Sequence, residues 1–348
     1  GEAHGALGRS RHPVIIVGAE AAALADELGP LLDAAACPIL TTYQAIGICP
    51  TEGQVHAGLF TNGALEAPVL DRADLLVTIG LDLVEPIPAP WTRTVDVLRV
   101  SSETLRDAYL PAGIDLVGDV VAIVSELLDG VSTSWGEDDA RGFRSSAREV
   151  IRACRAPERV PGTLDPIEVV DTVTLSAPRR ATVTVDAGAH FLAVMPLWPV
   201  ARARQLLISN GLATMGFSLP AAIGAALARP DLPVIAITGD GGMSMVLAEL
   251  ETVARLSLPI TVIVMNDAAL SLIEVKQGAG HGDRSAVRYS PVDFAAIARA
   301  SGMDGDVVES PGELARVLGE GWSTPRLIDV RVDPSSYPAI IAATRSPT

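Results

Sequence analysis

The sequence is poor in aromatic residues and in positive charge. Only 4% of the 348 residues are aromatic while 49% are apolar, so its cores must be built from aliphatic side chains. This length is enough for two ordinary hydrophobic cores. The 26 basic residues are outnumbered by 42 acidic ones, and the formal charge of −16 disfavours nucleic acid and anionic membranes as partners. A local pocket can still hold a phosphate.

Cysteine and long hydrophobic runs are also scarce. Cys37, Cys49 and Cys154 lie far apart without metal-type spacing, which predicts reduced thiols and not a disulfide framework. No uncharged apolar run approaches the length of a membrane span, and the N-terminal stretch GEAHGALGRSRHP has no apolar signal core. We therefore expect a cytoplasmic protein without a transmembrane segment.

Short apolar runs rich in β-branched residues alternate with helical stretches along the chain. Continuous apolar runs of this kind are typical of parallel strands that are covered on both faces. The alternation predicts an α/β fold of two domains, each a mainly parallel sheet flanked by helices. In the first part, the expected strands cover residues 13–17, 39–42, 75–79 and 95–100.

The composition changes between residues 130 and 166. A charged helix is expected over 137–153, and Pro157, Pro161 and Pro166 follow it. Prolines interrupt regular structure, so the domain boundary is expected here. The predicted organisation is a central, Rossmann-like domain over 1–130, a linker with a helix over 131–165 and a second domain over 166–348.

The stretch from Val234 to Gln277 predicts a βαβ unit. Two buried strands flank a helix that Pro259 ends. A polar turn follows each strand, GDG at 239–241 and ND at 266–267. Both turns are expected at one sheet edge, where open α/β sheets bind ligands. The expected elements are strands over 234–238 and 260–265 and a helix over 245–256.

The two turns carry groups that suit a divalent cation and a phosphate. Mg2+ prefers oxygen ligands and usually takes one or two carboxylates, which Asp240 and Asp267 would supply. Gly241 and Gly242 begin a helix and offer backbone N–H groups to a phosphate. An isolated GDG is weak evidence because these residues are ordinary turn formers, but two such turns on neighbouring strands are stronger. A simple turn cap is the alternative for each aspartate.

These motifs resemble those of thiamin diphosphate enzymes of the acetolactate synthase and 2-oxo acid decarboxylase group. In that family the cofactor motif begins with GDG and ends, one helix later, in an Asn-Asn pair, which Asn266 and Asp267 match here. Asp267 departs from the usual second asparagine but remains an acceptable ligand. The resemblance covers nearly the whole chain. It extends to DAGAH at 186–190, to MGFSLPAAIGA at 215–225 and to a central domain before residue 130.

The resemblance implies a role for each matched position. Asp240 and Asp267 would bind Mg2+ together with the backbone carbonyl of Ala269. Met215 would lie beneath the thiazolium ring, and the carbonyl of Ala213 would accept the 4′-amino group. The other positions implied to contact thiamin diphosphate are Gly188, His190, Gly241, Gly242 and Leu270. A turn histidine and a core methionine are the alternatives for His190 and Met215.

Full-length members of this family begin with a pyrimidine-binding domain, whose glutamate protonates the cofactor's aminopyrimidine. Nothing before Pro13 is a candidate for that glutamate, so no catalytic residue is assigned within this chain. The resemblance implies a separate pyrimidine-domain subunit, self-association and an α2β2 assembly in which this chain is the large subunit. An artificial truncation is the alternative.

The implied reaction decarboxylates a 2-oxo acid and transfers the acyl carbanion to a carbonyl acceptor. The cofactor carries the difficult chemistry and the protein orients it. The acetolactate-synthase-like central domain and the segment SLIEVKQ favour carboligation. Lys276 stands where acetolactate synthases have tryptophan, which suggests a different acceptor or an anionic substrate near Leu272, Lys276 and Gln277. A solvated lysine is the alternative.

Several other functions stay open. A simple 2-oxo acid decarboxylase subunit or an inactive binding or regulatory homologue would carry the same motifs. A nucleotide-dependent oxidoreductase would use the turn at Gly18, but this turn lacks the full GxGxxG pattern. Some relatives hold FAD in the central domain. Here Gly80 is followed by Leu81, Asp82 and Leu83 in place of the expected arginine, and the Asp82 charge would repel a flavin diphosphate, so no FAD is expected.

Overall fold

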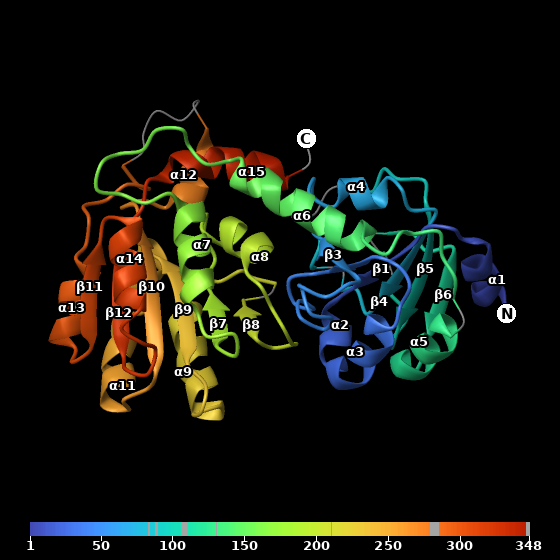
Figure 1. Cartoon of the computed structure of the whole chain (residues 1–348), viewed down its shortest axis with the longest axis horizontal. Helices are drawn as coiled ribbons and strands as arrows, with labels where there is room; N and C mark the ends of the chain where they lie inside the picture. Colours follow the sequence, from blue (N-terminus) through green and yellow to red (C-terminus); the bar gives the residue numbers. More distant parts are fainter. Residues whose placement is uncertain are drawn as a thin grey trace. The chain divides into compact units, whose positions relative to one another are not determined.

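The computed structural model contains two α/β units, each built on a six-stranded sheet (Figure 1). The first unit takes residues 1–150, 199–204 and 344–348, and the second takes 151–198 and 205–343. The linker expected over 131–165 is therefore divided at Ile151. The structure describes residues 1–82, 84–87, 90–105, 110–129, 131–209, 211–278 and 285–345, so Leu83, the boundary residue Gly130 and the chain end after 345 lie outside it.

The first sheet has the strand order β3-β2-β1-β4-β5-β6, and every neighbouring pair is parallel. This confirms the expected mainly parallel sheet, although the short strands β3 and β6 were not predicted. The side chains of β1 and β4 are buried along their full length. The strands are β1 Pro13–Val17, β2 Ile39–Thr41, β3 His56–Leu59, β4 Leu75–Ile79, β5 Asp96–Ser101 and β6 Ile114–Val117.

Alternating residues of the first sheet pack into two separate cores. Ile15 and Val17 belong to a cluster with residues of α3 and α5, and Val14 and Ile16 belong to a cluster with Phe60 and residues of α4. Because successive side chains of a strand point to opposite faces, both faces of the sheet are covered. The helices of this part are α1 Glu2–Arg9, α2 Ala19–Ala22, α3 Ala25–Asp33, α4 Ala67–Leu70, α5 Val120–Leu128 and α6 Asp139–Arg152.

The second sheet has the order β11-β12-β10-β9-β7-β8 and is also parallel throughout. β9 and β10 are neighbours, with Gly239 in register with Met265. The predicted return of the chain to one sheet edge is thereby confirmed. The strands are β7 Thr182–Val185, β8 Leu206–Ile208, β9 Val234–Gly239, β10 Ile260–Asn266, β11 Asp304–Val308 and β12 Arg326–Arg331.

One face of the second sheet packs against helices α9, α11 and α13, through a core that includes Leu219, Leu250 and Phe294. Two further helices, α7 and α14, pack against each other (Figure 1). The helices of this part are α7 Pro166–Ser176, α8 Phe191–Leu197, α9 Ser218–Ala228, α10 Asp240–Met245, α11 Glu249–Arg255, α12 Ser271–Gln277, α13 Phe294–Ala300, α14 Pro311–Leu318 and α15 Tyr337–Thr344, and Pro334–Ser336 forms a single 3-10 turn.

The helix expected over 245–256 is wrong, because the chain forms two shorter helices there. α10 begins at Asp240, directly after β9, and ends at Met245, because the φ of −129° and ψ of 24° at the next residue, Val246, are not helical. Val246 is β-branched and packs close to Gly216 of the loop before α9. Met243 of α10 and Leu250 of α11 belong to the same core.

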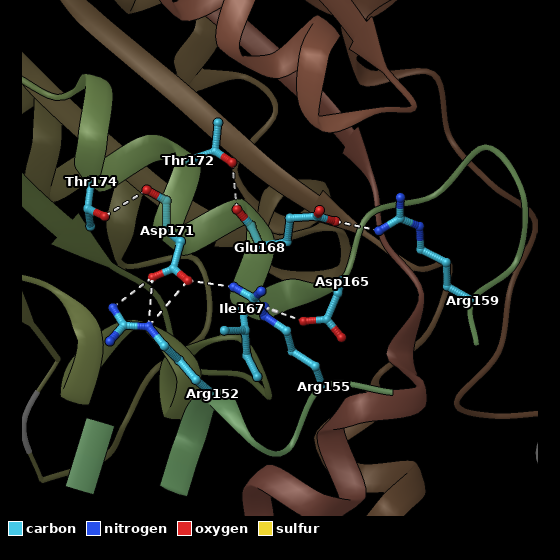
Figure 2. A network of polar contacts seen from close by, with 9 residues as sticks. All are labelled: Arg152, Arg155, Arg159, Asp165, Ile167, Glu168, Asp171, Thr172 and Thr174. Atoms are coloured by element: carbon cyan, nitrogen blue, oxygen red, sulfur yellow. Dashed lines mark hydrogen bonds and ion pairs between the residues drawn. The ribbon is translucent and has the colours of Figure 1, made fainter. Parts of the chain in front are cut away.

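Three arginines of the segment before α7 form ion pairs with acidic residues of that helix (Figure 2). Arg152 and Arg155 both pair with Asp171, at 3.0 Å and 2.5 Å, and Arg159 pairs with Glu168 at 2.6 Å. α7 itself begins with Asp165, whose carboxylate accepts the backbone N–H of Ile167. Such a cap satisfies one of the free N–H groups at a helix start.

All three cysteines are free thiols, as the sequence predicts. Burial raises the pKa of Cys37 and of Cys49 to about 12, which makes both thiols poor nucleophiles at neutral pH. None of the helices in the described ranges is long and apolar enough to span a membrane.

Candidate functional site

A cavity of about 270 Å³ lies in the second unit, at the carboxyl ends of β7, β9 and β10. Its walls come from the turns after these three strands, from the loop before α9 and from α12 and α15. Almost every position proposed from the sequence contributes to it. The predicted residues that line the cavity are Gly188, His190, Ala213, Met215, Asp240, Gly241, Gly242, Asp267, Ala269, Leu270, Leu272 and Lys276.

Gln277 is the predicted position that does not line the cavity. It ends α12, one residue beyond Lys276, and is partly buried away from the opening. Leu272 and Ile273 face the cavity from the first turn of the same helix, while Lys276 is exposed at its rim. The apolar side chains and the single cation give this wall the composition of a substrate pocket.

Asp240, which is buried, and Asp267, which is partly buried, form an acidic pair. Burial raises the pKa of Asp240 to about 6. Burial and the charge of Asp240 raise the pKa of Asp267 to about 7. No lysine, arginine or histidine of the described ranges forms an ion pair with either carboxylate. Two carboxylates that share a site repel each other, so a cation between them would stabilise both.

Each carboxylate is held by local hydrogen bonds. Asp240 accepts the backbone N–H of Gly241 through Oδ1 at 2.8 Å. The Tyr289 hydroxyl lies close enough to this carboxylate to lower its pKa, although no described donor meets the geometry of a full hydrogen bond to the buried Oδ2. Asp267 accepts the N–H of Ala269 at 3.2 Å and the hydroxyl of Ser271 at 2.5 Å. Asp267 therefore also acts as a turn cap. The unpartnered Asp240 oxygen is the atom best placed for an added ligand.

The turn after β10 depends on an unusual backbone conformation. Ala268 has a φ of +56°, a left-handed conformation that costs energy for a residue with a side chain. A second segment supports the turn, because Leu270 donates to the carbonyl of Val287 at 2.8 Å and Tyr289 donates to the carbonyl of Ala268 at 3.1 Å. Strain of this kind persists where the surrounding structure holds it in place.

Asp186 is a central residue of the site that the sequence did not reveal as such. Its carboxylate is fully buried and accepts the N–H groups of Gly216 and Phe217, at 2.9 Å and 3.0 Å, and the hydroxyl of Thr238 at 2.8 Å. It thereby joins the end of β7 to the end of β9 and to the loop before α9. A Cβ on Gly242 would lie 2.1 Å from Asp186 Oδ2. The position of the buried Asp186 carboxylate therefore requires a glycine at 242, whether or not Gly242 also contacts a diphosphate.

His190 lies on the floor of the cavity with its ring against the backbone of Gly188 and Gly239. It is 3% exposed, and burial lowers its pKa to about 4 against the opposing effect of Asp186. The ring is therefore neutral at pH 7 and carries one N–H donor. Its Nε2 has no hydrogen-bond partner in the described part of the chain.

Met215 and Ala213 come from the loop before α9. Ala213 has a φ of +47° and Gly216 a φ of +75°, so the loop reverses direction on both sides of Met215. The Met215 Cε lies 3.2 Å from the place where a Cβ of Gly241 would stand. The methionine is partly exposed and faces the cavity, which argues against a purely core role. Ser218 begins α9, and its hydroxyl donates to the carbonyl of Thr184 at 3.0 Å.

Two tyrosines near the acidic pair were also missed. Tyr337 is buried at the start of α15 and lines the cavity. The hydroxyl of Tyr289 lies 3.2 Å from where a Cβ of Gly241 would stand. Burial and the charges of Asp240 and Asp267 raise the pKa of both phenols. Neither belongs to a local pattern, so only the fold reveals their proximity.

The residues present fit a divalent cation with a phosphate group. Within the described ranges, no three His, Cys, Asp or Glu side chains converge to form a complete metal site. A cation at Asp240 and Asp267 would thus need oxygens from backbone and ligand, which is how Mg2+ is usually held beside a diphosphate. The unpartnered Asp240 Oδ2 and His190 Nε2 are polar atoms of this cavity that such a ligand could contact.

Comparisons with known proteins identify the class to which this arrangement belongs. Residues 2–127 match the model of the thiamine pyrophosphate enzyme central domain, and residues 186–330 match that of the C-terminal TPP binding domain. Thiamine pyrophosphate is another name for thiamin diphosphate. The chain belongs to the thiamine pyrophosphate enzymes, of which it contains the central and the C-terminal domains.

Among curated proteins the chain is similar to acetolactate synthases. It is 32% identical to the acetolactate synthase of Bacillus subtilis over 321 residues, which is 87% of this chain and 55% of the relative. It is 32% identical to the catabolic acetolactate synthase of Raoultella terrigena over 298 residues, 82% of this chain and 52% of the relative. The isozyme 3 large subunit of Escherichia coli is 27% identical over 347 residues, 94% of this chain and 60% of the relative. The chain thus spans little more than half the length of these relatives.

Proposed function

We propose that the second unit holds thiamin diphosphate through Mg2+ at Asp240 and Asp267, and that the protein decarboxylates a 2-oxo acid and transfers the acyl group to a carbonyl acceptor. The acidic pair carries this proposal. One buried and one partly buried carboxylate line the same cavity, without a basic partner in the described ranges and with one oxygen that accepts no hydrogen bond there. The similarity to acetolactate synthases supports the choice of reaction.

The residues of this chain would bind and orient the cofactor. Asp240 and Asp267, with the carbonyl of Ala269, would hold the cation, and the neutral ring of His190 would donate to a diphosphate oxygen. When bound, thiamin diphosphate supplies the carbon nucleophile and stabilises the carbanion left by decarboxylation. Met215 would support the ring system of the cofactor. Asp186 would hold Met215 in position, because it accepts the N–H groups of the next two residues of the loop.

Substrate contacts are proposed on α12. Leu272 and Ile273 would give an apolar wall for the carbon chain of the 2-oxo acid or of the acceptor. Lys276 would attract a carboxylate at the rim, since its ammonium is exposed there. The similarity to acetolactate synthases favours transfer to a carbonyl acceptor over simple decarboxylation.

We further propose that a pyrimidine domain on a separate subunit supplies the activating glutamate, in an α2β2 assembly. The resemblance to the family assigns this role to no residue of the present chain. The name of the Escherichia coli relative, a large subunit, supports an enzyme with unlike subunits. In this arrangement the chain by itself binds the cofactor but turns over little or no 2-oxo acid.

Calorimetry tests the binding step. Thiamin diphosphate with Mg2+ is titrated into the wild-type chain, into Asp240→Asn and into the control Asp231→Asn, an exposed aspartate of the same unit. We expect Asp240→Asn to weaken binding at least tenfold, because the cation loses a charged ligand, and the control to bind like the wild type. Tighter binding of NAD than of thiamin diphosphate would contradict the proposal and favour an oxidoreductase.

Product analysis tests the reaction. Pyruvate serves as the probe, with and without a pyrimidine-domain protein, and both the aldehyde and the carboligation product are measured. We expect the carboligation product only in the mixture. Full activity of the chain alone would refute the need for a partner, and aldehyde as the main product would favour a decarboxylase.

A further inference from the structure

The carboxyl edge of the first sheet is the place where a ligand would be expected in this unit. Two strands, β2 and β3, lie on one side of β1, and β4, β5 and β6 lie on the other. The strands that precede β4 in the chain are therefore added on one side of β1 and the later strands on the other, so the order of strands switches direction between β1 and β4. Doubly wound sheets bind ligands in the crevice at such a reversal, often through an anionic group held by backbone N–H groups.

The side chain of Glu85 fills this crevice. Its carboxylate accepts the backbone N–H of Ala19 at 2.7 Å, the hydroxyl of Thr42 at 2.5 Å and the backbone N–H of Asp82 at 3.1 Å. Ala19, Thr42 and Asp82 follow β1, β2 and β4, respectively. One carboxylate thus collects donors from the ends of three neighbouring strands, as a bound anion would.

The lack of a side chain at Gly18 allows the turn after β4 and Glu85 to approach it closely. A Cβ at Gly18 would lie 2.4 Å from the Cα of Leu81 and 2.8 Å from Oε2 of Glu85. The glycine after β1 therefore admits the turn after β4 and the glutamate that this turn carries. The space beside Gly18 is already taken, so this glycine needs no dinucleotide to explain it.

Two further glutamates close the same edge of the sheet. Glu66 is 2% exposed and accepts the N–H groups of Thr61 and Gly63, both at 2.8 Å, just beyond the end of β3. Glu20 accepts the N–H of Ser102 after β5, also at 2.8 Å. The chain's own carboxylates therefore take donors at the ends of five of the six strands, and their negative charge opposes entry of a phosphate.

We propose that Glu85 is an internal anion that occupies the ligand crevice of the first unit and keeps phosphate-bearing ligands such as nucleotides out of it. Removal of its carboxylate would free two backbone N–H groups and one hydroxyl, all pointing at the same place. The crevice would then accept a small phosphate compound. This inference is independent of the site in the second unit.

Calorimetry with inorganic pyrophosphate, in a buffer with EDTA, tests the proposal. The Glu85→Ala variant is compared with the wild type and with Glu27→Ala, which removes an exposed glutamate of the same unit and so matches the change in charge. The wild type and Glu27→Ala report any binding elsewhere in the chain. We expect Glu85→Ala to gain a binding event at least tenfold tighter than this background.

Circular dichroism shows whether the Glu85→Ala variant is folded. If the folded variant binds pyrophosphate only as well as the wild type, the proposal is overturned. Hydrogen exchange of the wild type gives a second test that needs no variant. If the carboxylate occupies the crevice, the amides of Ala19 and Asp82 exchange at least tenfold more slowly than free loop amides. Exchange at the rate of free loop amides would equally overturn the proposal.

Discussion

Asp240 and Asp267 destabilise the folded protein when both are ionised and no cation joins them. Their pKa values in the folded chain, about 6 and about 7, are higher than the ordinary value of about 3.9. The folded state therefore binds protons more tightly than the unfolded state. The resulting stabilisation is fully present below about pH 4 and is lost as the pH rises through 6 and 7.

The Asp267→Asn variant tests this balance. It removes one of two repelling charges, so without divalent cations its free energy of unfolding should fall less between pH 5 and pH 8 than that of the wild type. We expect a difference on the order of 2 kcal/mol at pH 8. Urea unfolding at both pH values in EDTA measures it, and Mg2+ with thiamin diphosphate should stabilise the wild type more than the variant. Identical pH profiles would show that the pKa of Asp267 is not raised in the folded chain.

Gly242 offers a second test at the scale of one residue. A methyl group here would stand 2.1 Å from the buried Asp186 carboxylate and 2.8 Å from the Thr238 hydroxyl. We expect Gly242→Ala to destabilise the protein by about 2 kcal/mol or more, because the core must shift to admit it. Gly224→Ala on α9 is the matched control, since nothing lies within 4 Å of its new Cβ and alanine favours a helix by up to about 1 kcal/mol. Equal stability of the two variants in urea would contradict the close contact.

Among the elements, the pairing of Arg152 and Arg155 with Asp171 gives a salt-dependent prediction (Figure 2). Both arginines are more than 40% exposed, so solvent screens the interaction and its value stays modest. We expect Asp171→Asn to lower the free energy of unfolding by less than about 1 kcal/mol at low salt, and by nearly nothing in 1 M NaCl. Glu251→Gln, which breaks an exposed pair within α11, is the control. A loss that salt does not change would mean that Asp171 acts through packing.

Some elements could be predicted from the sequence because they depend on local pattern. The strands at 13–17 and 75–79 agree with β1 and β4, since their apolar runs are continuous and end at glycine. The return of Asp240 and Asp267 to one place also follows from a single βαβ unit. β3 and β6 escaped notice because they are short edge strands, and β3 contains Gly58 while β6 alternates in burial.

The rest of the site depends on pairings that span many residues. Asp186 accepts hydrogen bonds from Gly216 and Thr238, which are 30 and 52 positions away in the sequence. No local sequence pattern around Asp186 predicts either partner. Glu85 could not be placed for the same reason, because its role requires the order of β2, β1 and β4. Tyr337 reaches the cavity from the last helix. Sequence motifs therefore named most of the residues that line the cavity. They did not name residues whose partners depend on the order of the strands, such as Asp186 and Glu85.

At the scale of the whole molecule, the two units should respond differently to ligand. Thiamin diphosphate with Mg2+ is expected to slow hydrogen exchange in the turns at 186–190, 213–217, 239–242 and 266–271, because these segments surround the cavity. The sheet of the first unit should exchange at an unchanged rate, since its crevice holds Glu85. Hydrogen exchange with mass spectrometry measures both. Protection confined to the first unit would contradict the proposed cofactor site in the second unit.

The order of strands in the second sheet has a consequence for folding. The cavity floor joins the ends of β7 and β9, and the acidic pair joins the ends of β9 and β10, so neither exists before these non-local pairings form. Closing such long loops costs entropy and makes folding slow. A cofactor at the proposed site would therefore bind only molecules whose sheet has already formed. It would stabilise the folded protein without helping the chain to fold.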